Sequence, residues 1–139
     1  MDMKAISLFL LRFSTGIYLA LWGVDKLMDA SHAVGLSDRF YGGAISMESI
    51  IPLLGALQVL LGVLVMLGAL RSISYWAQLA WYAIGIVPII GYILDPFALY
   101  LVERGHLTWF PSTTLLFASL VLIAFKEFDT ISVDHKRGR

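Results

Sequence analysis

Four long apolar stretches dominate this chain, and clusters of polar or turn-forming residues separate them. They cover approximately residues 5–26, 49–70, 75–94 and 107–125. Each has close to the ~20 residues that an α-helix needs to cross roughly 30 Å of bilayer hydrocarbon. None shows the strict alternation and frequent turns of a membrane β-barrel. The pattern therefore predicts an all-α, polytopic membrane protein with four membrane-spanning helices.

Composition supports a single membrane domain over residues 1–139. Hydrophobic residues make up 59% of the chain and charged residues only 14%, whereas soluble domains carry about 25% charged residues. The mean hydropathy is +0.82. The chain has no cysteine, which excludes disulfides, thiolate catalysis and cysteine-bound iron–sulfur clusters. Any electron transfer would therefore need a borrowed cofactor.

The basic residues are unevenly divided between the two sides of such a bundle. With both termini cytoplasmic, the inner side carries Lys4, Arg12, Arg71, Lys126, Lys136, Arg137 and Arg139, and the outer side carries Lys26, Arg39 and Arg104. This arrangement satisfies the positive-inside rule, and the opposite orientation does not. We therefore expect an antiparallel four-helix bundle with both termini in the cytoplasm and a polar cytoplasmic tail over residues 126–139.

The connections between the spans have distinct lengths. Arg71–Ser74 is short enough to make the second and third spans antiparallel neighbours. Met28–Glu48 and Phe97–His106 are predicted to be outer loops. The first apolar stretch could also be a secretory signal peptide, but Arg12 interrupts it and Asp25–Leu27 separates it from the small residues of a cleavage site. We expect it to remain as a membrane anchor.

Glycines recur on one face of each of the first two predicted helices. They are Gly16 and Gly23 on the first helix, and Gly55 and Gly62 on the second. At about 100° per residue, a spacing of seven places each pair in one narrow sector. Because glycine lets two helix backbones approach closely, we predict that these four positions pack helix against helix.

Two basic residues share that face of the first helix. Arg12 lies about 10 Å inside the span, where an unpaired charge near the bilayer centre costs on the order of 2.5–3.5 kcal/mol. It either snorkels to the cytoplasmic headgroups, or faces the bundle interior and binds an anionic or carbonyl-bearing ligand with Gln78. Lys26 is an interface charge at the outer end, where it either anchors to headgroups or pairs with Asp29.

Polar and aromatic residues on the second and third spans are candidates for the same ligand site. Gln58 and Gln78 are either interhelical hydrogen-bonding residues or ligand-binding residues. Trp81 and Tyr82 are the aromatic residues against which a quinone-like ring would stack. No side chain in this set has the pattern of a catalytic nucleophile, so we assign no catalytic residue.

Other site chemistries receive little support. His32 and His106 both lie on the predicted outer side, but no nearby carboxylate pattern accompanies them, so we expect no metal site. No histidine falls within a span, which argues against a bis-histidine haem. Phosphate-binding loops, nucleophile elbows and basic nucleic-acid stripes are also missing from the sequence. We expect no nucleic-acid partner.

Three groups of residues form a pattern that resembles the DoxX family. The first is Arg12-Phe13-Ser14-Thr15-Gly16 followed by Trp22-Gly23-Val24-Asp25-Lys26-Leu27; the second is Pro52, Gly55, Gln58, Gly62, Gly68 and Arg71; the third is Ile131-Ser132-Val133-Asp134. They resemble that family's first helix, second helix and Ser-Leu-Asp ending. The chain departs from the family at Gln58, where many members carry a glutamate, and at Lys126–Asp129, where members carry glycines.

The resemblance implies a four-helix protein of a bacterial-type inner membrane. The family's relatives include the membrane subunit of thiosulfate:quinone oxidoreductase, and wider relatives serve as cargo receptors or membrane-protein chaperones. Two functions follow as hypotheses. The chain is either an accessory subunit of a membrane oxidoreductase, with a quinone and a membrane or soluble redox partner, or a non-catalytic module that stabilises, escorts or scaffolds another membrane protein through its glycine faces. Neither requires catalysis by this chain alone, and either is compatible with a homo-oligomer in the lipid bilayer.

Overall fold

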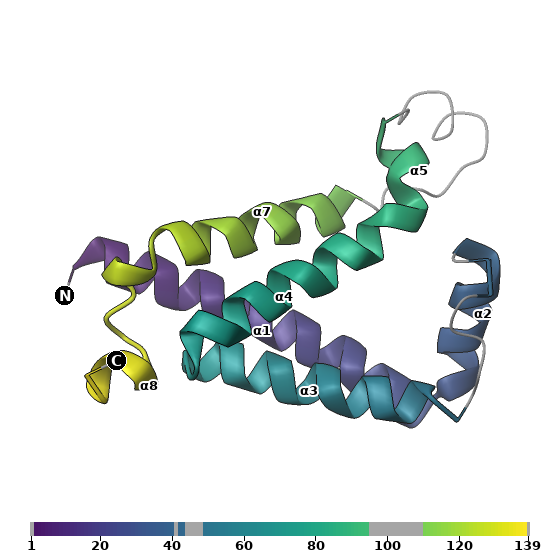
Figure 1. Ribbon diagram of the computed structural model, residues 1–139, viewed down its shortest axis with the longest axis horizontal. Coiled ribbons are helices and arrows are strands. Elements are labelled where there is room, and N and C mark those ends of the chain that lie inside the picture. Colours follow the sequence, from purple (N-terminus) through teal and green to yellow (C-terminus); the bar gives the residue numbers. More distant parts are fainter. Residues whose placement is uncertain (1, 41, 44–48, 95–109, 139) are drawn as a thin grey trace.

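The computed structural model describes residues 2–40, 42–43, 49–94 and 110–138 (Figure 1). Within these residues the chain is helical and contains no strand. The long helices are α1 (Met3–Met28), α3 (Ile51–Leu67), α4 (Arg71–Ile86) and α7 (Phe110–Ala124). The shorter elements are α2 (Ala30–Phe40), the 3₁₀ turn η1 (Val87–Ile89), α5 (Ile90–Leu94), the 3₁₀ turn η3 (Lys126–Phe128) and α8 (Val133–Lys136). The prediction of an all-α fold is confirmed.

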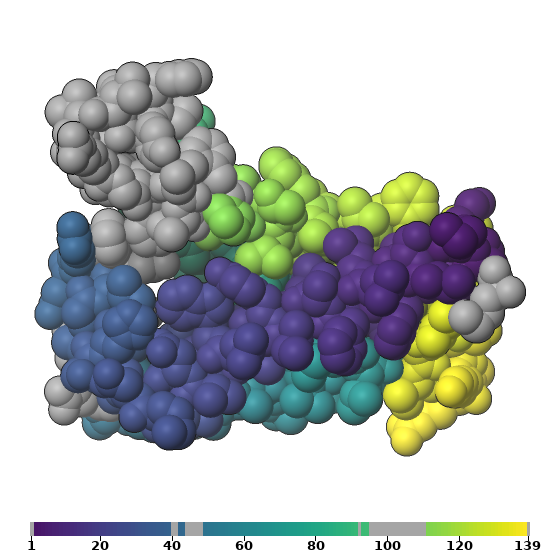
Figure 2. Space-filling view, turned by 180° about the vertical axis from the view of Figure 1, so that it is seen from behind, coloured from purple at the N-terminus to yellow at the C-terminus, as the bar shows by residue number. Residues whose placement is uncertain are grey.

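The long helices pack as antiparallel neighbours. Helices α1 and α3 run side by side along most of their lengths, α4 packs against α3 and α7, and α7 also touches α1 (Figure 1). From behind, α1 crosses the face of the molecule with α7 above it and α3 below it (Figure 2). Both termini and the α3–α4 turn lie at one end, and α2 lies at the other.

Helix length and apolarity separate α1 from the other helices. Among the described helices, α1 is the one that is both long and apolar enough to cross a membrane by itself. Helix α3 and Pro111–Ala124 of α7 are apolar but shorter, within 10–17 residues. Residues 107–109, at the start of the predicted fourth span, lie outside the described residues, as does the predicted loop Phe97–His106.

Helix α2 corrects the prediction of a loop over Met28–Glu48. Asp29 ends α1, and its backbone N–H donates to the carbonyl of Asp25. The Asp29 carboxylate then accepts hydrogen bonds from the Ser31 hydroxyl at 2.5 Å and the His32 N–H at 3.2 Å. A side-chain acceptor at this position starts a new helix, because it satisfies a backbone donor of the first turn.

The connection between α3 and α4 lies earlier than predicted. Arg71–Ser74 was expected to form the turn, but Arg71 is the first residue of α4. Gly68 ends α3 with φ of 64°, and Leu70 has φ of 51°, so both adopt left-handed backbone conformations. The apolar character of residues 68–70 hid this turn from the hydrophobic pattern.

Pro88 changes the helix that was predicted as the third span. Helix α4 ends at Ile86, a 3₁₀ turn follows over Val87–Ile89, and α5 continues to Leu94. Proline has no N–H to donate and its ring blocks the preceding turn, so an α-helix cannot pass through it unchanged.

The four predicted packing glycines face one another in two pairs between α1 and α3. A Cβ atom built on Gly16 would lie 2.8 Å from the carbonyl oxygen of Gly62, and one on Gly62 would lie 2.6 Å from that of Gly16. The corresponding distances for Gly23 and Gly55 are 2.7 and 2.8 Å. A side chain at any of these positions would collide with the backbone of the facing helix.

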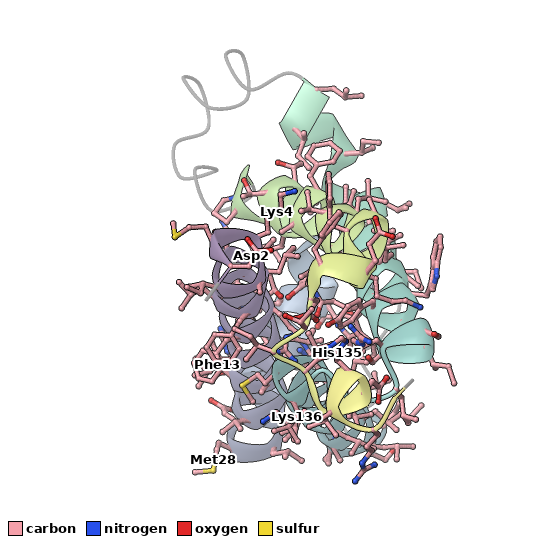
Figure 3. The ribbon with its side chains drawn as sticks, turned by 90° about the vertical axis from the view of Figure 1, so that its left-hand side faces the viewer. Asp2, Lys4, Phe13, Met28, His135 and Lys136 are labelled. Atoms are coloured by element: carbon pink, nitrogen blue, oxygen red, sulfur yellow. The ribbon has the colours of Figure 1, made fainter. Side chains whose placement is uncertain are left out.

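Apolar side chains cover the outside of the molecule, while polar side chains fill much of its centre. Large exposed residues occur on every long helix, for example Leu21, Leu53, Ile84 and Phe117. Seen from the end that carries the termini, Phe13 and Met28 project outward from α1 (Figure 3). In contrast, Arg12, Thr15, Gln78 and Ser119 are at most 2% exposed. Apolar residues such as Leu19, Val65 and Leu122 are buried beside them. The burial of so many polar side chains is uncommon in water-soluble domains.

Candidate functional site

Arg12 lies inside the helical bundle and is 1% exposed. Its Nη2 donates a hydrogen bond of 2.6 Å to the carbonyl oxygen of Ile131. Its Nε lies 3.6 Å from Oδ2 of Asp129, and its guanidinium carbon lies 5.5 Å from the centre of the Phe9 ring. Residues after α7 therefore supply the counter-charge for this buried cation.

The Asp129 carboxylate contacts two further side chains. The hydroxyl of Tyr75 donates to Oδ2 at 2.5 Å, and Nη1 of Arg71 lies 3.9 Å from the same oxygen. Arg71 also donates from Nη1 to the carbonyl oxygens of Lys126 at 3.0 Å and Asp129 at 2.9 Å. These contacts hold the carboxylate between two guanidinium groups and offset the cost of burying all three charges.

A second acid of the same segment caps α4. Asp134 accepts from the backbone N–H groups of Leu70 at 3.0 Å and Arg71 at 2.7 Å, and its carboxylate lies 3.9 Å from Nε of Arg71. Its own N–H donates to the carbonyl oxygen of Gly68 at 3.1 Å. A helix N-terminus favours such a carboxylate because it presents unpaired N–H donors and positive potential.

Gly68 provides the space in which these groups meet. A Cβ atom at Gly68 would collide with Nη1 of Arg12 and would lie 2.6 Å from Cβ of Ser132. Ser132 donates to the carbonyl oxygen of Asp129 at 2.9 Å and accepts from the N–H of His135 at 3.3 Å. The requirement for glycine therefore comes from both the backbone conformation and the contact with Arg12.

Arg12, Arg71, Asp129 and Asp134 together form a neutral four-charge cluster. It joins α1 and α4 to the C-terminal segment, whose final turn, with His135 and Lys136, lies across this end of the molecule (Figure 3). A cavity of about 180 Å³ beside the cluster is lined by residues that include Arg71, Lys126 and Asp134. That volume is below the roughly 300–1,000 Å³ of most small-molecule sites.

The remaining predicted ligand residues have partners of their own. Nε2 of Gln78 donates to the Ser119 hydroxyl at 2.8 Å, and the Tyr82 hydroxyl donates to the carbonyl oxygen of Thr15 at 3.1 Å. No hydrogen bond joins Gln78 to Arg12 among the described residues. The two residues therefore stabilise different helix contacts: Gln78 joins α4 to α7, whereas Arg12 holds the C-terminal segment.

Gln58 and Trp81 take no part in these hydrogen bonds. Gln58 is 4% exposed, and its Oε1 has no hydrogen-bond partner among the described residues. Trp81 is half-buried on α4, next to Tyr82. The contacts of the structure assign neither residue a ligand.

The charged residues at the far end of α1 form two local pairs. Nζ of Lys26 donates to the carbonyl oxygen of Trp22 at 3.3 Å and lies 5.5 Å from its ring centre, so it does not pair with Asp29. Nδ1 of His32 lies 2.9 Å from Oδ2 of Asp25. The expectation of a histidine without a carboxylate neighbour was therefore wrong for His32, because the α1–α2 corner folds it back. His106 lies outside the described residues.

Sequence reasoning assigned no site role to Arg71, Tyr75, Asp129 or Asp134, although Arg71 and Asp134 belong to the motifs that carry the DoxX resemblance. One signal was available, because a buried arginine requires an acid and Asp129 and Asp134 lie on the same predicted side as Arg12. In the part of the chain that the structure describes, no group of three or more histidine, aspartate or glutamate side chains could hold a metal ion.

Comparisons with known proteins add no relative. No protein-family model matches the chain, and neither the curated proteins nor the solved structures gave a significant match. The likeness to the DoxX family therefore rests on the sequence motifs alone.

Proposed function

We propose that this chain is a DoxX-like, multi-pass protein of the inner membrane that acts as a non-catalytic module, stabilising, escorting or scaffolding another membrane protein. The observation that carries the proposal is the internal pairing of three of the five predicted ligand residues. Arg12 is bonded to the C-terminal segment, Gln78 to Ser119, and Tyr82 to the backbone of Thr15. Nη1 of Arg12 has no hydrogen-bond partner among the described residues, but it is buried against Gly68. A quinone carbonyl would have to displace the surrounding segment to reach it.

The apolar outer surface supports placement in a bilayer. Leu21, Leu53 and Ile84 are 60%, 61% and 73% exposed, and each Å² of apolar surface left in water costs about 25 cal/mol. Lipid tails remove that cost. Residues 71–94 form three consecutive helical elements that would extend about 36 Å at 1.5 Å per residue, and local bilayer thinning accommodates the shorter α3 and α7.

The positions of the chain ends support the orientation with both termini in the cytoplasm. The N-terminus, the C-terminus and the α3–α4 turn share one end of the molecule (Figure 1). That end carries Lys4, Lys126, Lys136 and Arg137. Basic residues concentrate on the cytoplasmic side of inner-membrane proteins.

A protein partner would meet surfaces other than the glycine faces. Because Gly16 and Gly23 pack against Gly62 and Gly55, these faces are already covered inside the molecule. The opposite side of α3 presents Leu53, Leu57 and Leu60, which are 48–61% exposed. Because they are four and three residues apart, these leucines lie on one side of α3 and form an apolar stripe. A helix of a partner protein could pack against such a stripe.

The test is purification of the tagged chain from its native membrane in a mild detergent, followed by measurement of copurified proteins and quinone. We expect one membrane protein at near-stoichiometric amounts, and the abundance of that protein should fall when the chain is deleted. Quinone should be no more enriched than bulk lipid. Retention of about one quinone per chain would contradict the proposal and favour the oxidoreductase subunit.

A further inference from the structure

A second polar site lies at the opposite end of α1 from the four-charge cluster. An open surface hollow of about 190 Å³, called a cavity below, is lined there by Tyr18, Leu21, Trp22, Asp25 and His32. Four of these residues come from α1, where spacings of three and four residues place them along one side of the helix. His32 comes from α2, because the chain turns at Asp29 and brings the first turn of α2 against the end of α1.

The aromatic wall of this cavity suits a cation. The ring centres of Tyr18 and Trp22 lie 6.3 Å apart, and the rings are inclined by 60°. Each residue is 36% exposed, so the faces are accessible from outside. Nζ of Lys26 already lies 5.5 Å from the Trp22 ring centre, within the range of a cation–π interaction.

The acidic wall has an unused acceptor. His32 bonds Oδ2 of Asp25, and among the described residues no other side chain or backbone group hydrogen-bonds that carboxylate. Oδ1 is therefore left for a ligand, and the Asp25 side chain is 38% exposed. A primary ammonium can donate to this oxygen, whereas a quaternary ammonium has no N–H to donate.

We propose that this cavity binds the headgroup of a phosphatidylethanolamine-type lipid in the outer leaflet. The ammonium donates to Oδ1 of Asp25 beside the Tyr18 and Trp22 rings, and the neighbouring Lys26 ammonium attracts the phosphate. The hollow is open to the outside, as a site for the headgroup of a membrane lipid must be, and tyrosine and tryptophan are enriched at this depth of membrane proteins. The site rests on the membrane placement proposed above.

The preference for a primary ammonium provides the test. The purified chain is exchanged into an equimolar mixture of phosphatidylethanolamine, phosphatidylcholine and phosphatidylglycerol, and lipids retained per chain are counted by native mass spectrometry. We expect the wild type to retain phosphatidylethanolamine about tenfold over phosphatidylcholine, because only the former makes the charge-assisted hydrogen bond. Asp25→Asn should remove this preference, and His32→Asn, which keeps the carboxylate, should preserve it.

Glu127→Gln is the control, because it neutralises an exposed acid at the opposite end of the molecule that neither lines the cavity nor positions His32. Equal retention of the three lipids by the wild type, or equal losses in Asp25→Asn and Glu127→Gln at unchanged melting temperature, overturns the site. Competition by free phosphoethanolamine at millimolar concentration, with no lipid retained, overturns the lipid source and identifies a soluble ligand.

Resistance of the wild type to carbonate extraction tests membrane placement separately. If the chain resists extraction but shows no headgroup preference, the lipid site is wrong and the proposed function stands. If carbonate extracts the chain from the membrane, both the lipid site and the proposed membrane function are wrong. The two outcomes are therefore distinguishable.

Discussion

Nε of Arg12 lies 3.6 Å from Oδ2 of Asp129, and both side chains are 1% exposed. This pair connects α1 to the segment that follows α7, two parts of the chain that are distant in sequence. The arginine that looked like a ligand-binding or snorkelling residue is therefore a structural cation with an internal partner. Its contacts define the most direct tests of the structure.

Asp129→Ala should strongly destabilise the protein, because it leaves Arg12 buried without its counter-ion. Loss of one member of a buried pair typically costs about 3–5 kcal/mol. A denaturing-detergent titration of the purified variant would measure the loss. The double variant Arg12→Met/Asp129→Leu should lose less free energy of unfolding than the sum of the losses in Arg12→Met alone and Asp129→Leu alone. Glu127→Ala changes an exposed neighbouring acid and is the control. A similar loss of stability in Asp129→Ala and Glu127→Ala would argue against the pair.

Asp134→Ala should fray the start of α4. Loss of an N-cap acceptor costs about 0.5–2 kcal/mol, and the amides of Leu70 and Arg71 should exchange hydrogen faster. Asp134→Asn retains one acceptor oxygen and should have a smaller effect. Hydrogen exchange followed by mass spectrometry reports both variants, and unchanged protection of these amides in Asp134→Ala would contradict the cap.

Gly62→Leu should disrupt the contact between α1 and α3. A side chain there meets the backbone of Gly16, whereas Val63 on the next position is 37% exposed. Overpacking typically costs about 1–3 kcal/mol. Val63→Leu adds the same residue type at an open position, so its melting temperature in detergent should stay close to that of the wild type. Equal melting temperatures for the two variants would refute the close approach.

Gly68→Ala should destabilise the protein for two reasons. The residue adopts φ of 64°, which costs a side-chain-bearing residue roughly 1–2 kcal/mol, and its Cβ would collide with Arg12. Gly35→Ala is a suitable comparison, since a Cβ there meets nothing within 4 Å. The melting temperature of Gly68→Ala should be well below that of Gly35→Ala. A lower melting temperature for Gly35→Ala would exclude this explanation.

Single cysteines should report opposite sides of the membrane, because the chain has no native cysteine. Gly35→Cys lies on α2 and should react with an impermeant maleimide in intact spheroplasts. Gly138→Cys lies beyond α8 and should react only after permeabilisation. Labelling of Gly138→Cys in intact cells would reverse or remove the proposed orientation.

Much of the fold was accessible from local patterns. The four apolar stretches predicted the long helices, because hydrophobic length and helix formation are properties of neighbouring residues. Gly16, Gly23, Gly55 and Gly62 likewise shared faces that follow from helix periodicity. The connections were less accessible, since α2 depends on the side chain of Asp29 and the α3–α4 turn involves apolar residues.

The sequence by itself determined that this chain is helical, that it is rich in apolar residues and that a charged Arg12 lies inside the first predicted span. Only the tertiary structure decided that the partner is Asp129 and that Asp134 caps α4. Helix periodicity specifies which direction a side chain takes from its own axis, but not which distant segment meets it. The path of residues 126–136 depends on the charges, caps and space that α1, α3 and α4 present together, so the polar tail and the buried cation become one cluster only when the chain is folded.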